Sequence, residues 1–147
     1  MRVAIATIAI VIAPAVAAAC QCGTELSPQE AFAASPLVVA GVVVEIKETE
    51  LQVQYGGGPF TWVIQDATFQ VQRVWKGFPG PTLLLSQRSN CAIQLSEGAS
   101  YLLYLSTPQD GDREVSKCSR FRRYAHADLD LEFLGPGEPV PRKVRAQ

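Results

Sequence analysis

The chain has 147 residues, with four cysteines, one histidine and a formal net charge of −1. A chain of this length suits one domain with a single hydrophobic core. The near balance of acidic and basic residues excludes a protein built around nucleic-acid binding, which needs a strongly basic face.

Residues 1–19 have the pattern of a secretory signal peptide. Arg2 precedes a long apolar run, and Ala17 and Ala19 occupy the small positions before a cleavage site. The run is too short and too close to that site for a good membrane span, which makes an uncleaved anchor the weaker alternative. Cleavage removes Arg2, so the 13 basic residues fall to 12 against 14 acidic ones, a formal charge of −2. We therefore expect export, to the periplasm or by secretion.

A short helix is predicted first in the exported part. Ser27 and Glu30 form a capping box, with Pro28 at the first helical position. Pro36 is expected to end this helix.

Strands are predicted in the next 40 residues. Residues 37–48 are β-branched and largely apolar, which favours a long central strand, and Gly41 inside it indicates a bulge or tight bend. Residues 51–65 read as strand, turn and strand. The glycine triplet 56–58 is predicted to be a hairpin loop, because a phosphate loop needs a following lysine and helix.

Residues 67–77 alternate as in a half-buried antiparallel strand. We expect Phe69, Val71 and Trp75 to face one interior. Arg73 has the same parity, so it should lie at a rim or be paired, because a buried unpaired charge is costly. The other face is formed by Thr68, Gln70, Gln72 and Val74.

The second half continues with strands at 81–87 and 100–107 and a short strand at 113–120. A helix is predicted at 125–135, and the tail at 136–147 is proline-rich, charged and expected to be disordered. The helix is expected to place Ala125, Leu129 and Phe133 on one stripe and to end at Gly135. Five or six short strands with a helix near each end favour an antiparallel barrel or sandwich.

All four cysteines, Cys20, Cys22, Cys91 and Cys118, lie in the exported part. An oxidising compartment favours two disulfides. A Cys20–Cys22 bridge would close a tiny, strained ring, which leaves two long-range pairings open. A four-cysteine zinc site is disfavoured because the paired C-x₂-C spacing is missing.

No set of residues has the pattern of a catalytic site, so we expect no enzyme activity, no cofactor and no metal of the protein's own. A lone histidine on a helix is usually a surface or cap residue, and alternating acids usually form a solvated face. A basic cluster is expected at a solvated strand edge, with an acidic partner as the alternative. The lone histidine is His126, the alternating acids are Asp128, Asp130 and Glu132, and the basic cluster is Lys117, Arg120, Arg122 and Arg123. Trp62 and Trp75 are expected to pack in the core or at a barrel rim.

Several motifs occur along the chain in an order that resembles that of a known family. They comprise Cys20-Gln21-Cys22 at the cleavage point, "PQEAF" (28–32), a glycine-containing valine strand (37–46), "VWKGF" (74–78), a middle cysteine, "YLLYL" and Cys118. This order resembles the N-terminal domain of the tissue inhibitors of metalloproteinases and the wider netrin-like module family. The resemblance covers residues 20–135. It implies a mainly β fold, a five-stranded Greek-key barrel of OB type with short flanking helices.

The resemblance also implies a site and a partner. It pairs Cys20 with Cys91 and Cys22 with Cys118. The free α-amine and carbonyl oxygen of Cys20 would chelate the catalytic zinc of a metalloprotease, and Gln21 would enter its specificity pocket. Cys22 would belong to this contact, and Ser89 and Asn90 would flank it, so the resemblance implies a metalloendopeptidase inhibitor.

Three departures keep alternatives open. Ala33 stands where the family has a cysteine, the cysteine-rich second domain is missing, and Gln21 is bulkier than usual. One alternative is an exported netrin-like binding or structural module without inhibitory activity. Another is an outer-membrane lipoprotein, in which "VAAAC" is a loose lipobox and Cys20 carries the lipid. Lipidation would leave three cysteines, an odd count, and for the exported protein it is the reading that involves a membrane.

Overall fold

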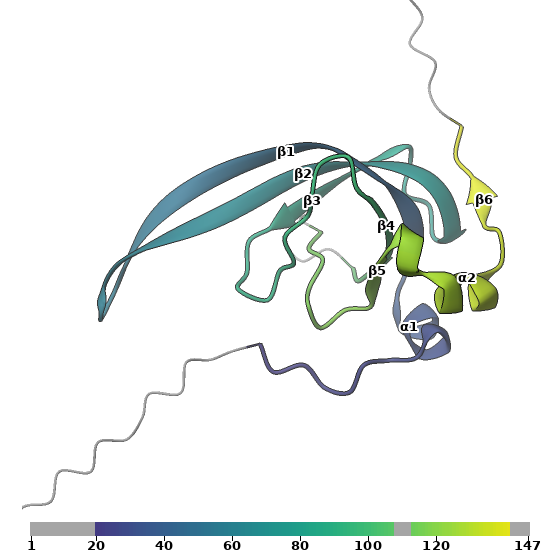
Figure 1. The fold of residues 1–147 in the computed structure, drawn as a ribbon, viewed down its shortest axis with the longest axis horizontal. Helices are drawn as coiled ribbons and strands as arrows, with labels where there is room; N and C mark the ends of the chain where they lie inside the picture. Colours follow the sequence, from purple (N-terminus) through teal and green to yellow (C-terminus); the bar gives the residue numbers. More distant parts are fainter. Residues whose placement is uncertain (1–19, 108–112, 142–147) are drawn as a thin grey trace, which may run out of the picture.

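The computed structural model describes residues 20–107 and 113–141, so the predicted signal peptide and the end of the tail lie outside the described residues. The protein is mainly β, with short helices, as expected (Figure 1). The elements are α1 (Pro28–Ala34), β1 (Leu37–Tyr55), β2 (Gly58–Lys76), β3 (Thr82–Gln87), β4 (Ser100–Leu105), β5 (Phe121–Arg123), the 3-10 helix η1 (Tyr124–His126), α2 (Asp128–Leu134) and β6 (Glu138–Pro139). In the described part of the chain, no helix is long and apolar enough to cross a membrane.

The strands form one antiparallel sheet of six strands in the order β3-β2-β1-β4-β5, with β6 pairing with β2. A closed five-stranded barrel was expected. Among residues 20–107 and 113–141, no strand pairing joins β3 to β5, so the ladder stays open. The segment 113–116 makes isolated bridges instead, from Arg113 to Leu85 and from Ser116 to Ala92.

β1 and β2 are each 19 residues long and form one continuous hairpin, so the prediction of separate short strands is wrong here. β4 pairs with β1 only as far as Val42, and β3 pairs with β2 only from Gln65. Because Glu48 pairs with Gln65, only residues 49–64 leave the sheet as a two-stranded ribbon, called the arm below, which Figure 1 shows extending to one side. A ribbon that is open to solvent on most sides accepts charged residues. The polar and charged residues around residue 49 therefore look in the sequence like the end of one strand, although the strand continues through them.

Gly41 lies at a register shift in the hairpin, as predicted. Gly41 faces Val71 while Ala40 faces Arg73, so Gln72 is an extra residue on β2. A Cβ at Gly41 would lie 2.0 Å from the carbonyl oxygen of Gln70, which leaves room for glycine only.

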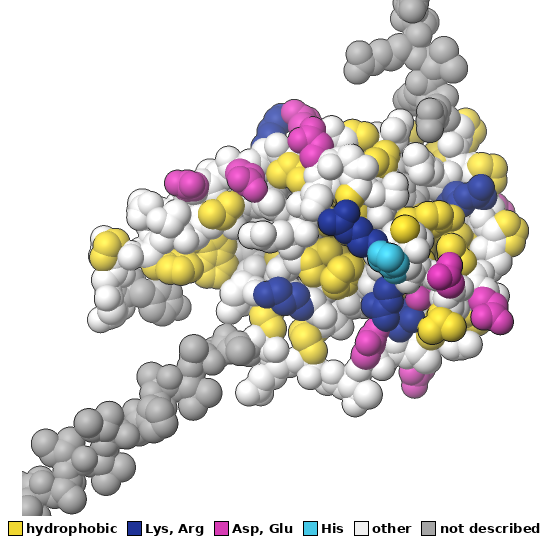
Figure 2. Space-filling view, viewed as in Figure 1, with side chains coloured by type: hydrophobic (Ala, Val, Ile, Leu, Met, Phe, Trp, Pro, Cys, Tyr) yellow, Lys and Arg dark blue, Asp and Glu magenta, His cyan; other side chains and the backbone are white. Residues whose placement is uncertain are grey.

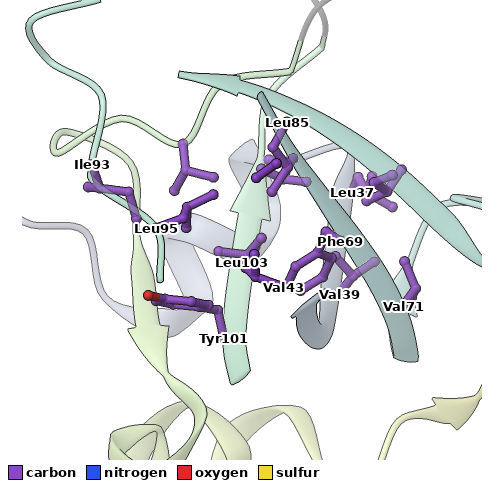
Figure 3. Close-up of a cluster of buried hydrophobic side chains, with 14 residues drawn as sticks. Leu37, Val39, Val43, Phe69, Val71, Leu85, Ile93, Leu95, Tyr101 and Leu103 are labelled. Carbon is purple, nitrogen blue, oxygen red and sulfur yellow. The ribbon is translucent and has the colours of Figure 1, made fainter. Parts of the chain in front are cut away.

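The bulge changes which side chains share a face, and it corrects the prediction for Trp75. Phe69 and Val71 belong to the larger core cluster (Figure 3). Trp75 packs instead against the smaller cluster on the opposite face, because an extra residue reverses the alternation. Arg73 donates from Nη1 to the carbonyl of Pro136 at 2.8 Å, so it is paired, as expected.

The smaller cluster lies between the sheet and the two α-helices. It contains Ala31, Val38, Ala40, Leu102, Tyr104 and Ala127. The capping box at Ser27 is present in full, and α1 ends before Pro36, as predicted. The rings of Phe32 on α1 and Phe133 on α2 meet edge to face at 5.9 Å, so the helices lie side by side.

Two predictions for the last third of the chain are wrong in detail. The predicted strand at 113–120 is not formed, and Cys118 lies in a turn before the short strand β5. The apolar stripe on α2 is formed by Leu131 and Leu134 rather than by Leu129, which is 73% exposed. The helix does end at Gly135, with φ of +71°.

The start of the tail is ordered, which corrects the prediction of a disordered tail for residues 136–141. β6 pairs with β2, and the amide of Val140 donates to the carbonyl of Gln72 at 2.9 Å. Val140 also packs against the larger core cluster. Proline content misleads here because an edge strand tolerates residues without an N–H.

Candidate functional site

Two disulfides fix the beginning of the described chain. Cys20 is bonded to Cys91 and Cys22 to Cys118, with Cα–Cα distances of 5.4 and 5.0 Å. This is the pairing that the resemblance implies. Because all four thiols are bonded, a four-cysteine zinc site is excluded. Two such bonds indicate an oxidising, extracellular-type environment.

The disulfides give residues 20–22 a fixed position. They span 71 and 96 residues of sequence. In the chain-entropy model, loops of this size stabilise the folded state by about 4–5 kcal/mol each. Gln21 lies between the two anchors and is exposed. The sequence Cys20-Gln21-Cys22 is therefore a rigid strip that presents one free side chain to solvent.

The first disulfide also brings this strip to the loop after β3, where Ser89 and Asn90 precede Cys91. These two residues are exposed. We call Cys20, Gln21, Cys22, Ser89 and Asn90 together the ridge. The resemblance names the same residues as the protease contact.

Glu114 holds the loop of the ridge, and no pattern in the sequence indicates this role. Its carboxylate accepts hydrogen bonds from the amides of Arg88 and Ser89 at 3.1 and 2.9 Å. It also accepts one from the Ser89 hydroxyl at 2.5 Å. The Ser89 hydroxyl in turn accepts from the amide of Cys91 at 3.1 Å. Glu114 therefore orients the loop mainly through backbone amides. Ser89 is 25 residues from Glu114 in the sequence, and a contact with a backbone amide does not depend on the type of side chain, so the sequence gives no sign of it.

A buried ion pair supports the chain just after Cys22. Asp130 on α2 accepts two hydrogen bonds from Arg120, and Arg120 also donates to the carbonyl of Leu26 at 2.7 Å. Glu25 contacts Arg120 and Arg122. The segment between Cys22 and α1 is thus tied to β5 and α2.

The electrostatics of this pair follow from its contacts. Burial disfavours the charged form of Asp130, but hydrogen bonds from Arg120 and Tyr104 outweigh it, so the pKa of Asp130 lies below its ordinary value. The hydrogen bond to Asp130 raises the pKa of Arg120 in spite of its burial. Burial, together with the hydrogen bond to Asp130, raises the pKa of the Tyr104 hydroxyl. Both charges of the pair therefore persist at neutral pH.

These contacts correct two expectations about surface charge. Asp130 was expected on a solvated face and is 1% exposed. The basic cluster was expected at a solvated edge; β5 is indeed an edge strand, but Arg120 is buried and Arg122 is paired with Glu25. Arg123 lies over the ring of Tyr101, 5.1 Å from its centre. The hydrophobic period of a helix does not reveal that one of its acids is buried by a partner from a different segment of the chain.

The remaining candidates lie away from the ridge. His126 is exposed in η1, as expected (Figure 2). Trp62 is half-buried on the arm and meets Phe60 edge to face at 6.0 Å. Trp75 donates from Nε1 to the carbonyl of Gly135 at 2.9 Å. In the described residues, no group of three or more His, Cys, Asp or Glu side chains is placed to hold a metal ion.

If the chain is cleaved after Ala19, as the sequence predicts, the ridge would include a chain terminus. Cleavage after Ala19 would leave Cys20 with an α-amine and a carbonyl oxygen close together, held by its disulfide. A neutral amine and a carbonyl can both donate to a metal ion. Comparison with protein-family models found no family that matches this chain, and a search of curated proteins found no match either.

Proposed function

We propose that the protein is an exported inhibitor of zinc metalloproteases of the netrin-like type, in which Cys20 becomes the N-terminal residue and chelates the zinc of the protease. The observation that carries the proposal is the pair of disulfides that hold an exposed Cys20-Gln21-Cys22 strip against the loop at Ser89. The protein itself would supply no catalytic residue and no metal.

The fold we propose for this function is a Greek-key barrel of OB type. The antiparallel order β3-β2-β1-β4-β5 supports it. In this proposal the segment 113–116 closes the gap between the edges, since its bridges reach Leu85 on β3 and Ala92 in the loop that follows. The chain then continues directly to β5 at the other edge.

Zinc chelation by the terminus is chemically reasonable. A catalytic zinc ion has three protein ligands and one position open to water or substrate, and it can expand its coordination to accept both an amine and a carbonyl. A terminus already held by two disulfides loses little conformational freedom on binding, so less of the binding free energy is spent on ordering. Gln21, exposed beside it, would enter the specificity pocket of the protease.

The departures from the family affect different parts of this proposal. The cysteine replaced by Ala33 would have anchored the end of α1, but Lys76 anchors it here by donating to the carbonyls of Phe32 at 2.7 Å and Ala33 at 3.3 Å. The helix therefore does not need the missing disulfide. The size of Gln21 instead limits which protease pockets accept it.

Two other functions remain as alternatives to be tested. An exported netrin-like binding module would use the same fold without chelating zinc. A lipoprotein would need the sulfur of Cys20 for a thioether, and the bond from that sulfur to Cys91 argues against it. The intact mass of the exported protein reports the cleavage site, any lipid and both disulfides in one measurement.

The test compares three forms of the mature protein against a panel of zinc metalloproteases. One form starts at Cys20, one carries a single extra alanine before Cys20, and one is acetylated at the amine. An added residue moves the amine by about 3.5 Å, whereas zinc–nitrogen bonds are about 2.0–2.1 Å with little tolerance. Acetylation removes the lone pair and leaves the disulfides in place.

We expect inhibition by the first form alone, and a smaller loss for Gln21→Gly, which removes only the contact with the pocket. Equal inhibition by all three forms would refute chelation. No inhibition by the form that starts at Cys20 would favour the binding module.

A further inference from the structure

A groove of about 580 Å³ lies between the arm and the loop that follows β3. It adjoins the ridge, because Ser89 and Asn90 belong to both. The arm side is formed by residues 60–63 of β2, and Figure 2 shows apolar side chains gathered on the arm. The opposite side includes Gln87, Asn90 and Lys117.

The arm presents a free strand edge to this groove. Pro59 faces Gln54 in the hairpin, and proline has no N–H, so this pair makes no ladder hydrogen bonds. The alternation of an antiparallel ladder then directs the N–H and C=O groups of Thr61 and Val63 away from β1. β3 takes the same side of β2 only from Gln65 onward. The backbone of Thr61 and Val63 therefore has no strand partner in the described residues.

A buried donor lies at the end of this free edge. Gln87, which is 4% exposed, pairs with Gln65 across the β2–β3 ladder and lines the groove. Its Oε1 accepts a hydrogen bond from the amide of Val115 at 3.0 Å, and this fixes the orientation of the amide group. Its Nε2 has no hydrogen-bond partner among the described residues. A buried donor without a partner costs free energy, which an acceptor in the groove would recover.

The charge of the groove indicates which kind of acceptor it takes. Among the described residues that line the groove, Lys117 is the one charged side chain and none is acidic. Its Nζ lies 3.5 Å from the carbonyl of Asn90, at the same side as Gln87. The groove therefore offers a neutral donor and a cation, together with the aromatic pair of Phe60 and Trp62.

We propose that this groove binds an extended, acidic segment of a partner protein, which adds to the sheet as a strand along Thr61 and Val63. Backbone pairing would supply the affinity, as in other cases of β-strand addition. Gln87 would donate to a carbonyl or carboxylate oxygen of the segment, and Lys117 would favour its negative charge. This proposal goes beyond inhibition, and it holds whether or not Cys20 binds zinc.

The test uses a blocked hexapeptide of alternating valine and glutamate as the probe, titrated into the disulfide-intact protein and followed by amide NMR. We expect shifts and slowed hydrogen exchange at Thr61 and Val63. A hexapeptide of alternating valine and lysine should bind more weakly, because Lys117 repels it.

Two proline variants form a matched pair, since Glu50 faces Val63 in the hairpin. Val63→Pro removes an N–H that points to the groove, and Glu50→Pro removes one that points to the opposite edge of the arm. Neither change breaks a β1–β2 hydrogen bond. We expect Val63→Pro to weaken the valine–glutamate peptide about tenfold and Glu50→Pro to leave its affinity unchanged.

Gln87→Glu keeps an acceptor for Val115 and removes the donor, so it should also weaken this peptide. The proposal is overturned if the peptide does not shift Thr61 and Val63, or if both proline variants weaken it equally. It is also overturned if the protein self-associates and Val63→Pro abolishes the dimer, because a second copy would then be the occupant. This test does not use the inhibition assays with the three N-terminal forms. The proposal of strand addition and the proposal of zinc chelation can therefore be refuted independently of each other.

Discussion

Arg120 and Asp130 form a two-point ion pair inside the protein: Nε lies 2.5 Å from Oδ1 and Nη2 lies 2.9 Å from Oδ2. The side chains are 6% and 1% exposed, and the hydroxyl of Tyr104 donates to Oδ1 at 2.8 Å. Arg120 precedes β5, Asp130 lies on α2, and the same guanidinium reaches Leu26. The pair therefore connects the N-terminal segment to the start of the edge strand β5 and to α2.

Asp130→Asn should destabilise the protein by about 3 kcal/mol, because the buried guanidinium of Arg120 keeps only the exposed carboxylate of Glu25, 3.3 Å from Nη1, as a counter-charge. The free energy of unfolding from urea denaturation measures the loss. Glu132→Gln on the same helix is the control and should change little. The double variant Arg120→Met/Asp130→Leu should recover most of the loss, since apolar replacements of a buried pair are often neutral. A cost for Asp130→Asn within the error of the Glu132→Gln control would contradict this account.

Stability should fall in acid partly through Asp130. Its pKa lies below the ordinary value of 3.8, since the hydrogen bonds from Arg120 and Tyr104 outweigh burial. A depressed folded pKa contributes stability that is present above the ordinary value and is lost as the pH falls through the folded value. We expect the unfolding free energy to drop below about pH 4, and Asp130→Asn to flatten that drop.

Glu25 also has a depressed pKa, through its hydrogen bond and charge interaction with Arg122, and its ordinary value is 4.5. Its contribution would begin to fall at slightly higher pH than that of Asp130. Glu25→Gln separates the two, because the slope that remains in this variant belongs to Asp130 and the other acids. A slope below about pH 4 that is identical with and without Asp130 would contradict the assignment.

Local signals in the sequence predicted local structure well. The capping box at Ser27 needs only residues three apart, and Gly41 indicates a bulge because no other residue allows such a close approach of two backbones. The hairpin loop was predicted at 56–58 from its glycines and from the absence of a phosphate-loop lysine; the structure places it at Gly56 and Gly57, with Gly58 beginning β2.

Features that depend on distant partners were not predictable in the same way. Whether Trp75 follows Phe69 into one core depends on a bulge at Gln72, which is set by the pairing with β1. Asp130 is buried because Arg120 comes from another segment, and Glu114 holds the ridge through backbone amides. The disulfide pairing of the candidate site came from the family resemblance, since the spacing of the cysteines alone left two pairings open.

Gly41→Ala should destabilise the protein by roughly 3 kcal/mol, because its Cβ would meet backbone atoms of Gln70 and not a side chain that can move. Gly56→Ala is the matched control, since a Cβ at Gly56 meets nothing within 4 Å. Thermal unfolding of both variants measures the difference. Equal melting temperatures would show that the two strands separate at Gly41 more easily than the register implies.

Glu114→Ala should loosen the ridge without unfolding the protein. The change removes the acceptor for the amides of Arg88 and Ser89, which lie 3.1 and 2.9 Å from Oε2. Both amides are on an exposed loop, so water can replace the carboxylate, and we expect a cost of only about 1–2 kcal/mol in overall stability. Their hydrogen exchange should nevertheless become faster, because the loop opens more often when its acceptor is lost.

Glu132→Ala serves as the control for the loss of one carboxylate away from the ridge, and the Cys20–Cys91 bond should remain intact in both variants. If the ridge is the contact with a protease, Glu114→Ala should also weaken inhibition, since the loop must then be ordered on binding. The conservative variant Glu114→Gln should retain part of the protection, because an amide oxygen still accepts from the backbone amides. Unchanged exchange at Arg88 and Ser89 in Glu114→Ala would mean that the disulfide alone holds the loop.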